Sequence, residues 1–145
     1  MSAALYTRDI LRLAVSIPHQ QRLEKPDGSA ELRSRTCGSV VAADVIVSDN
    51  GEIAELGMII SACALGQASA AILGAEAIGR TQSDIVEAQS GLHAFFDKRA
   101  DSPGDWQNMD KLEAAREHKG RHAAILLPYD ALVAALADAA ERKAA

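Results

Sequence analysis

Two cysteines carry most of the chemistry that this sequence offers. Cys37 lies in Thr-Cys-Gly-Ser at the start of a β-rich segment, and Cys63 lies in Ser-Ala-Cys-Ala just before a run of small residues. Unpaired N–H groups at the start of a helix favour a thiolate, which is the form that attacks sulfur and binds soft metals. The pair therefore predicts a site for metal or sulfur. The alternative is two buried cysteines with no chemical role.

Two of the four histidines, His118 and His122, have the spacing of a two-histidine metal site. Residues four apart share one face of a continuous helix. Gly120 lies between them and no His-Glu-x-x-His pattern is present, so two solvated histidines are the other interpretation. The sequence contains no phosphate-binding glycine loop, nucleophile elbow or carboxylate pair. We therefore expect a protein that is not an enzyme.

The composition sets bounds on the elements that must hold these residues. The chain has 145 residues, 48% of them apolar, which suits one domain over residues 1–145. Aromatic residues supply only 3%, so the core must come from close approach of helices with small side chains. A net charge of −5 argues against binding to duplex nucleic acid. Two cysteines and no leader-like start favour the reducing cytoplasm.

Residues 56–75 form a run of 20 without a charge, long enough to cross a membrane. Polar and glycine residues dilute its apolar character, and its first half continues a strand pattern. We expect a buried strand, turn and helix here, and no membrane span.

A β-meander is the clearest local pattern. Residues 39–48 are rich in β-branched side chains, with Val41 and Val45 on one face and Asp44 on the other. By the same alternation, Cys37 should point toward the inner face. Asp49-Asn50-Gly51 predicts a tight hairpin, because Asn-Gly tolerates positive φ angles. We expect strands over 30–36, 39–48 and 52–60.

Helical periodicity follows the meander. We expect helices over 4–15, 64–79, 82–97, 108–118 and 122–142, with a break at Gly120 and room for an interruption at Pro128. Thr81 and Asp84 resemble a capping pair for the third of these helices. Strands followed by helices predict an α+β fold, in which helices pack on one face of a small three-stranded antiparallel sheet.

These residues resemble the U-type iron–sulfur scaffold family, which includes IscU, SufU and the NifU N-terminal proteins. The resemblance runs from about residue 4 to 135. It comprises Leu5-Tyr6, Cys37-Gly38, the Asn-Gly hairpin, Cys63 and the Ala68-Ser69 step. The residues around 98–107 resemble the insertion of SufU-type members, and Arg121 to Tyr129 resembles their Arg-x-x-Cys-x-x-Leu-x-Trp segment.

Two positions depart from the family's ligand set. The resemblance places an aspartate where this chain has Ser39, and a third cysteine where it has Ala124. Of the four usual ligands only Cys37 and Cys63 are kept. His118 or His122 could complete the set, or a homodimer could pool two cysteines from each chain.

The resemblance implies a scaffold for iron–sulfur cluster assembly. Such a protein binds iron, a cluster or zinc, and accepts sulfur from a cysteine desulfurase for recipient apoproteins. The alternative is a degenerate family member that acts as a non-catalytic partner-binding or regulatory module.

Overall fold

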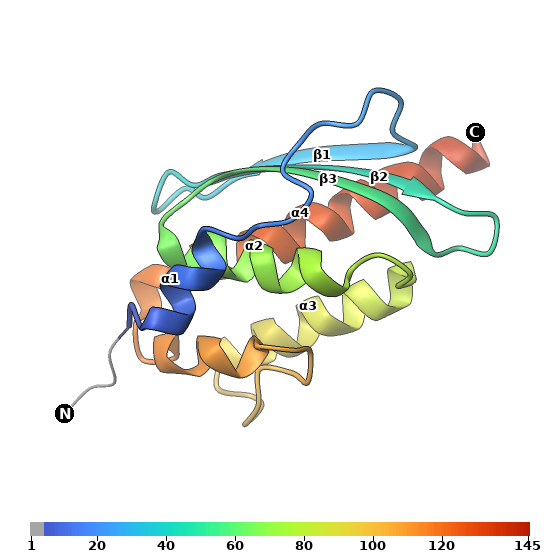
Figure 1. Ribbon diagram of the computed structural model, residues 1–145. Helices are drawn as coiled ribbons and strands as arrows, with labels where there is room; N and C mark the ends of the chain where they lie inside the picture. Colours follow the sequence, from blue (N-terminus) through green and yellow to red (C-terminus); the bar gives the residue numbers. More distant parts are fainter. Residues whose placement is uncertain (1–4) are drawn as a thin grey trace.

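The fold is described for residues 5–145 of a computed structural model (Figure 1). Over these residues the elements follow in this order: α1 Arg8–Ala14, β1 Gly28–Arg33, β2 Val40–Val47, β3 Ile53–Ser61, α2 Ala64–Glu76, α3 Gln82–Phe96, the 3₁₀-helix η1 Met109–Ala115, and α4 Lys119–Ala144.

The three strands form an antiparallel sheet in the order β1-β2-β3. Helix α4 crosses one face of the sheet with α2 beside it, and α1, α3 and η1 lie beyond them (Figure 1). This is the α+β meander that the sequence predicts, with its helices on one side. The close approach of small residues is also present, since a Cβ at Gly28 of β1 would overlap the backbone of Ala135 and Ala139 in α4.

The segment between α1 and β1, residues 15–27, which we call the strap, runs past β3 and contacts the other face of the sheet at Asp44. The carbonyl of His19 accepts a hydrogen bond from the Met58 N–H at 2.9 Å, so the strap follows the free edge of β3. A Cβ at Gly57 would overlap the carbonyl of Gln21, so strap and strand can touch only because residue 57 is glycine. The strap therefore occupies the middle of an edge that would otherwise be open to other strands.

Asp44 of β2 ties the strap to the sheet. Its carboxylate accepts from Arg22 Nε at 2.8 Å and Nη2 at 2.9 Å, and from the Leu23 N–H at 3.0 Å. The Ser29 hydroxyl donates to it at 2.6 Å. Burial raises the pKa of Asp44, but the hydrogen bonds from Arg22, Ser29 and Leu23 outweigh this and lower it from 3.8 to about 2.

Helix positions largely follow the sequence patterns. Thr81 and Asp84 form the expected capping box at the start of α3. Residues 56–75 form the end of β3 and most of α2, a buried strand, turn and helix as expected. Among the described residues only α4 is long and apolar enough to cross a membrane, and 56% of its apolar window is buried inside the structure, as is usual for a core helix.

Three helix expectations were wrong in detail. The segment expected as a helix over 108–118 is the shorter 3₁₀-helix η1. Helix α4 begins at Lys119, ahead of Gly120, and it runs through Pro128 without a break. A proline removes one helical hydrogen bond, here the bond to the carbonyl of Ala124, but packing against the sheet and α2 holds the helix together.

Candidate sulfur site

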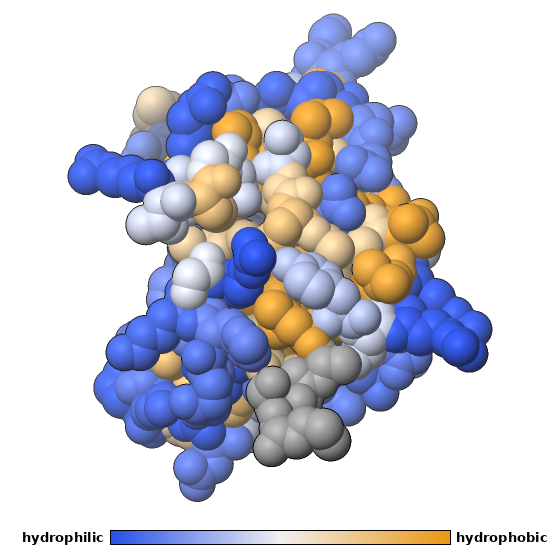
Figure 2. Space-filling model, turned by 90° about the vertical axis from the view of Figure 1, so that its left-hand side faces the viewer, coloured by the Kyte–Doolittle hydropathy of each residue, from blue (hydrophilic) through white to orange (hydrophobic). Residues whose placement is uncertain are grey.

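Both cysteines lie at the same end of the sheet. Val40, the first residue of β2, pairs with Ser61, the last residue of β3. Cys37 precedes Val40 by three residues and Cys63 follows Ser61 by two, so the antiparallel register brings both segments to one rim. Figure 2 views this end of the molecule, where apolar groups gather between hydrophilic margins.

Cys37 is exposed on the turn that leads into β2. The inward direction expected for Cys37 stays a prediction: the residue precedes β2, which begins at Val40, and its side chain is exposed. Gly38 makes the turn possible with a φ of 71° and has open space around it. The thiol is thus presented to solvent on a loop.

The surroundings of Cys37 favour its thiolate. The Ser39 hydroxyl lies 3.0 Å from Cys37 Sγ, and the Cys37 N–H donates to Ser34 Oγ at 3.4 Å. Partial burial raises the pKa of the Cys37 thiol. Hydrogen bonds from Ser34 and Ser39 and the positive charge of Arg121 outweigh this, so the pKa lies below its usual value of 9.0.

Cys63 is half-buried and occupies the N-cap position of α2. Its carbonyl accepts from the Gln67 N–H at 2.9 Å, while its side chain makes no capping hydrogen bond. Cys63 therefore stands at the N-terminus of a helix, where the sequence places it, and its thiol is not engaged as a cap.

Ala124 lies on α4, next to the first turn of α2 that follows Cys63. It is 1% exposed, and a Cβ at Gly66 of α2 would lie 3.4 Å from its methyl group. The first turns of α4 thus reach the start of α2, where the family's third cysteine would be expected. An alanine there contributes no ligand.

The histidines do not complete the site. His118 is the N-cap of α4, outside the helix, so it does not share a helical face with His122. His122 Nε2 lies 2.8 Å from the Ala115 carbonyl and 3.0 Å from the Arg116 carbonyl. Its ring packs against Phe96, with centroids 4.3 Å apart. These contacts turn His122 toward α3 and η1.

The ligand set therefore does not fit an intrachain metal centre. Within residues 5–145 no group of three or more His, Cys, Asp or Glu side chains is placed to hold a metal ion. Zinc and the irons of a cluster need about four ligands each, and this rim supplies two thiols and the hydroxyl of Ser39. The sequence missed the roles of Ser34 and Arg121, although the match of Arg121 to the family's Arg-x-x-Cys segment marked its place.

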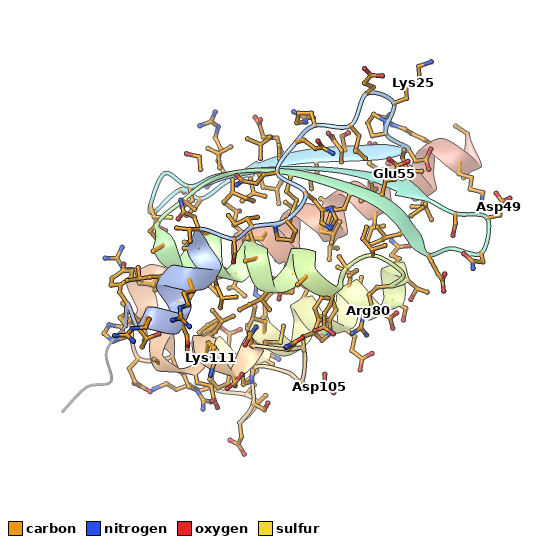
Figure 3. The ribbon with its side chains drawn as sticks, in the orientation of Figure 1. Lys25, Asp49, Glu55, Arg80, Asp105 and Lys111 are labelled. Carbon is orange, nitrogen blue, oxygen red and sulfur yellow. The ribbon has the colours of Figure 1, made fainter. Side chains whose placement is uncertain are left out.

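Two surface cavities lie elsewhere. One cavity, of about 350 Å³, is lined by residues that include Arg80, Asp84, Asp105 and Trp106. Arg80 and Asp105 are labelled in Figure 3. The other, of about 550 Å³, lies between the hairpin at Asp49 and the end of α4. Neither is lined by a cysteine.

Comparisons with known proteins complete the description. The chain matches no protein-family model and no curated protein sequence. It does resemble solved structures. One is a nitrogen-fixing NifU-like protein (N-terminal) from Brucella abortus, with 30% identity, a TM-score of 0.89, and coverage of 94% of this chain and 95% of that chain.

A second is a protein from the thermophile Fervidobacterium islandicum AW-1 assigned as an iron–sulfur cluster assembly scaffold for the SUF system. It has 19% identity and a TM-score of 0.83, and the match covers 91% of this chain and 96% of that chain. At this identity the second likeness shows the fold alone. The first has enough identity over nearly the full length of both chains to show kinship. The chain belongs to the U-type iron–sulfur scaffold family, together with the NifU-like N-terminal proteins.

Proposed function

We propose that this protein is a scaffold-type component of iron–sulfur cluster assembly that accepts sulfur on Cys37, with Cys63 as the second thiol of the same site. The observation that carries the proposal is an exposed thiol with a lowered pKa at the rim that also holds Cys63. A thiolate that solvent can reach is what sulfur transfer requires. The family membership supplies the biological process.

Iron, a cluster or zinc would be the cargo of this site. One chain offers two thiols, so a complete Cys₄ set requires a homodimer that pools Cys37 and Cys63 from both copies. We propose that any cluster is held this way. His118 and His122 are weak candidates, since the His122 ring is engaged with Phe96 and backbone carbonyls.

The partners proposed are a cysteine desulfurase as sulfur donor and recipient apoproteins, in the cytoplasm, with no chemical turnover by the chain itself. The apolar area on the cysteine end supports contact with another protein, because exposed apolar patches on soluble proteins usually mark interfaces (Figure 2). The second candidate is a regulatory or partner-binding module without cargo. Ser39 and Ala124 at family ligand positions favour it.

An anaerobic transfer assay tests the proposal. The protein is incubated with a cysteine desulfurase and ³⁵S-cysteine, and bound sulfane sulfur is located by mass spectrometry without reducing agents. We expect label on Cys37, lost in Cys37→Ser and kept in the matched variant Cys63→Ser. Labelling that is equal in the wild type and the double cysteine variant would eliminate the sulfur-acceptor role and favour the module.

A further inference from the structure

The Ser39 hydroxyl is the group in contact with the Cys37 sulfur. Ser34 and the positive charge of Arg121 act in the same direction, since both lower the pKa of the Cys37 thiol. Ser39 is only 4% exposed, and its hydroxyl lies 3.0 Å from Cys37 Sγ. When Cys37 carries a negative charge, its sulfur can only accept, so the Ser39 hydroxyl must donate to it. The groups beside Cys37 thus favour a negative charge on its sulfur.

A carboxylate at residue 39 would destabilise a negative charge on the Cys37 sulfur. An ionised carboxylate has only acceptor oxygens and a negative charge. Beside a thiolate it repels the sulfur charge unless a cation lies between the two, which is the role of a metal ion. A serine hydroxyl removes that repulsion and supplies a donor. The residue at position 39 therefore decides whether the site requires a cation or stabilises an anion by itself.

The rest of the rim agrees with this reading of Ser39. Ala124 places a buried methyl group where a further thiol would be needed. His122 directs Nε2 to the carbonyls of Ala115 and Arg116, so that this nitrogen is already engaged. Both departures lower the affinity for a metal, and neither disturbs the donors around Cys37.

We infer that Ser39 takes the place of a metal ion in this chain, so that Cys37 receives and holds sulfane sulfur without metal. The inference rests on the proposed function and deepens it. The Cys37 thiolate attacks the outer sulfur of a donor persulfide, R–S–SH. A new S–S bond forms at Cys37, the donor S–S bond breaks, and R–S⁻ leaves with the electron pair of the broken bond. No net oxidation or reduction occurs, and the charge left on the outer sulfur after proton loss is held by Ser39.

The test loads the chelator-treated full chain with sulfane sulfur from two donors. One is a cysteine desulfurase with cysteine, and the other is inorganic polysulfide. The variants are Ser39→Ala, Ser39→Asp and, as matched control, Ser90→Ala, which changes an exposed serine on α3. Persulfide on Cys37 is measured by mass spectrometry over time, and circular dichroism confirms that each variant is folded.

We expect wild-type loading to be the same with and without chelator. Ser39→Ala should shorten the persulfide lifetime about tenfold, because a hydrogen bond to a charged group is lost. Ser39→Asp should lose loading in chelator and regain it with added zinc, and Ser90→Ala should match the wild type. Wild-type loading that disappears with chelator and returns with zinc would overturn the inference, and so would an unchanged lifetime in Ser39→Ala.

The two donors separate the inference from the proposed function. Loading by polysulfide but not by the desulfurase, with the expected Ser39 effects, would remove the desulfurase as donor and leave the role of Ser39 standing. Loading by the desulfurase only when zinc is present would keep the desulfurase as donor and overturn the role of Ser39.

Discussion

A few side chains lower the pKa of the Cys37 thiol, and Arg121 is the most readily tested of them. In a Cys63→Ser background, Arg121→Gln should raise the pKa of Cys37, because the positive charge that stabilises its thiolate is lost. A higher pKa means less thiolate at a given pH below 9.0, so alkylation by iodoacetamide should slow and its pH profile should move to higher pH.

The control for Arg121→Gln is Lys143→Gln, which removes one positive charge near the far end of α4. The control should leave the alkylation profile unchanged. Equal shifts in both variants would show that net charge, and not the position of Arg121, sets the reactivity.

For single residues, the sequence predicted which residue types form the candidate site better than it predicted their exposure and contacts. Cys37 and Cys63 could be found because a cysteine before a strand and a cysteine before a helix are local signals. The exposure of Cys37 could not, because it depends on where β2 begins. The engagement of His122 with Phe96 and with η1 depends on tertiary packing that no local spacing records.

Among the elements, the strap offers the clearest prediction. Asp44→Asn should lower the free energy of unfolding at pH 7 by about 2 kcal/mol, the linkage value of a pKa moved from 3.8 to about 2. Because the folded-state pKa is lowered, this stability is present above 3.8 and is lost as the pH falls toward 2. Urea unfolding at pH 7 and at acid pH should therefore show the gap between wild type and variant closing. A gap that stays constant would contradict the role of Asp44.

The cap of α3 provides a second prediction at this scale. Thr81→Ala removes the hydroxyl that accepts from the Asp84 N–H and should cost about 1 kcal/mol of stability. Thr81→Ser keeps an oxygen in place and should cost much less. Thermal unfolding of the three proteins measures the difference, and equal losses in both variants would assign the effect to the threonine methyl group instead.

The elements that the sequence predicted best are those with local signals. The hairpin at Asn50-Gly51 and the box at Thr81 and Asp84 need only neighbouring residues. The continuity of α4 through Pro128 and the 3₁₀ form of η1 were missed, since packing against other elements overrides local preference there. The strap has no periodicity of its own, so its course over the sheet could not be foreseen.

For the molecule as a whole, the proposal that two chains share one cluster can be tested by mass. If two chains pool their cysteines, anaerobic addition of iron and sulfide should produce charge-transfer absorbance and double the mass seen by light scattering. Chelation should reverse both changes. Cys37→Ser should remain at the mass of one chain, and coloured protein at that mass would contradict a shared site.

A single cooperative unit is a further expectation at this scale. Trp106, the only tryptophan, is 8% exposed beneath the Arg80 guanidinium and reports on the loop between α3 and η1. Its fluorescence and the far-ultraviolet circular dichroism should give one coincident urea transition. Separate midpoints would divide the chain into independently folding parts.

The placement of α4 has a practical consequence. Its last residues, Arg142 and Lys143, lie beside the hairpin at Asp49 and Gly51, at the opposite end of the sheet from the cysteine rim (Figure 1). A probe or resin attached at Lys143 would hold the molecule by that end and leave the cysteine rim turned away from the support. Immobilised in this way, the protein could be exposed in turn to a sulfur donor, a wash and an acceptor, so that each transfer is timed separately on one sample.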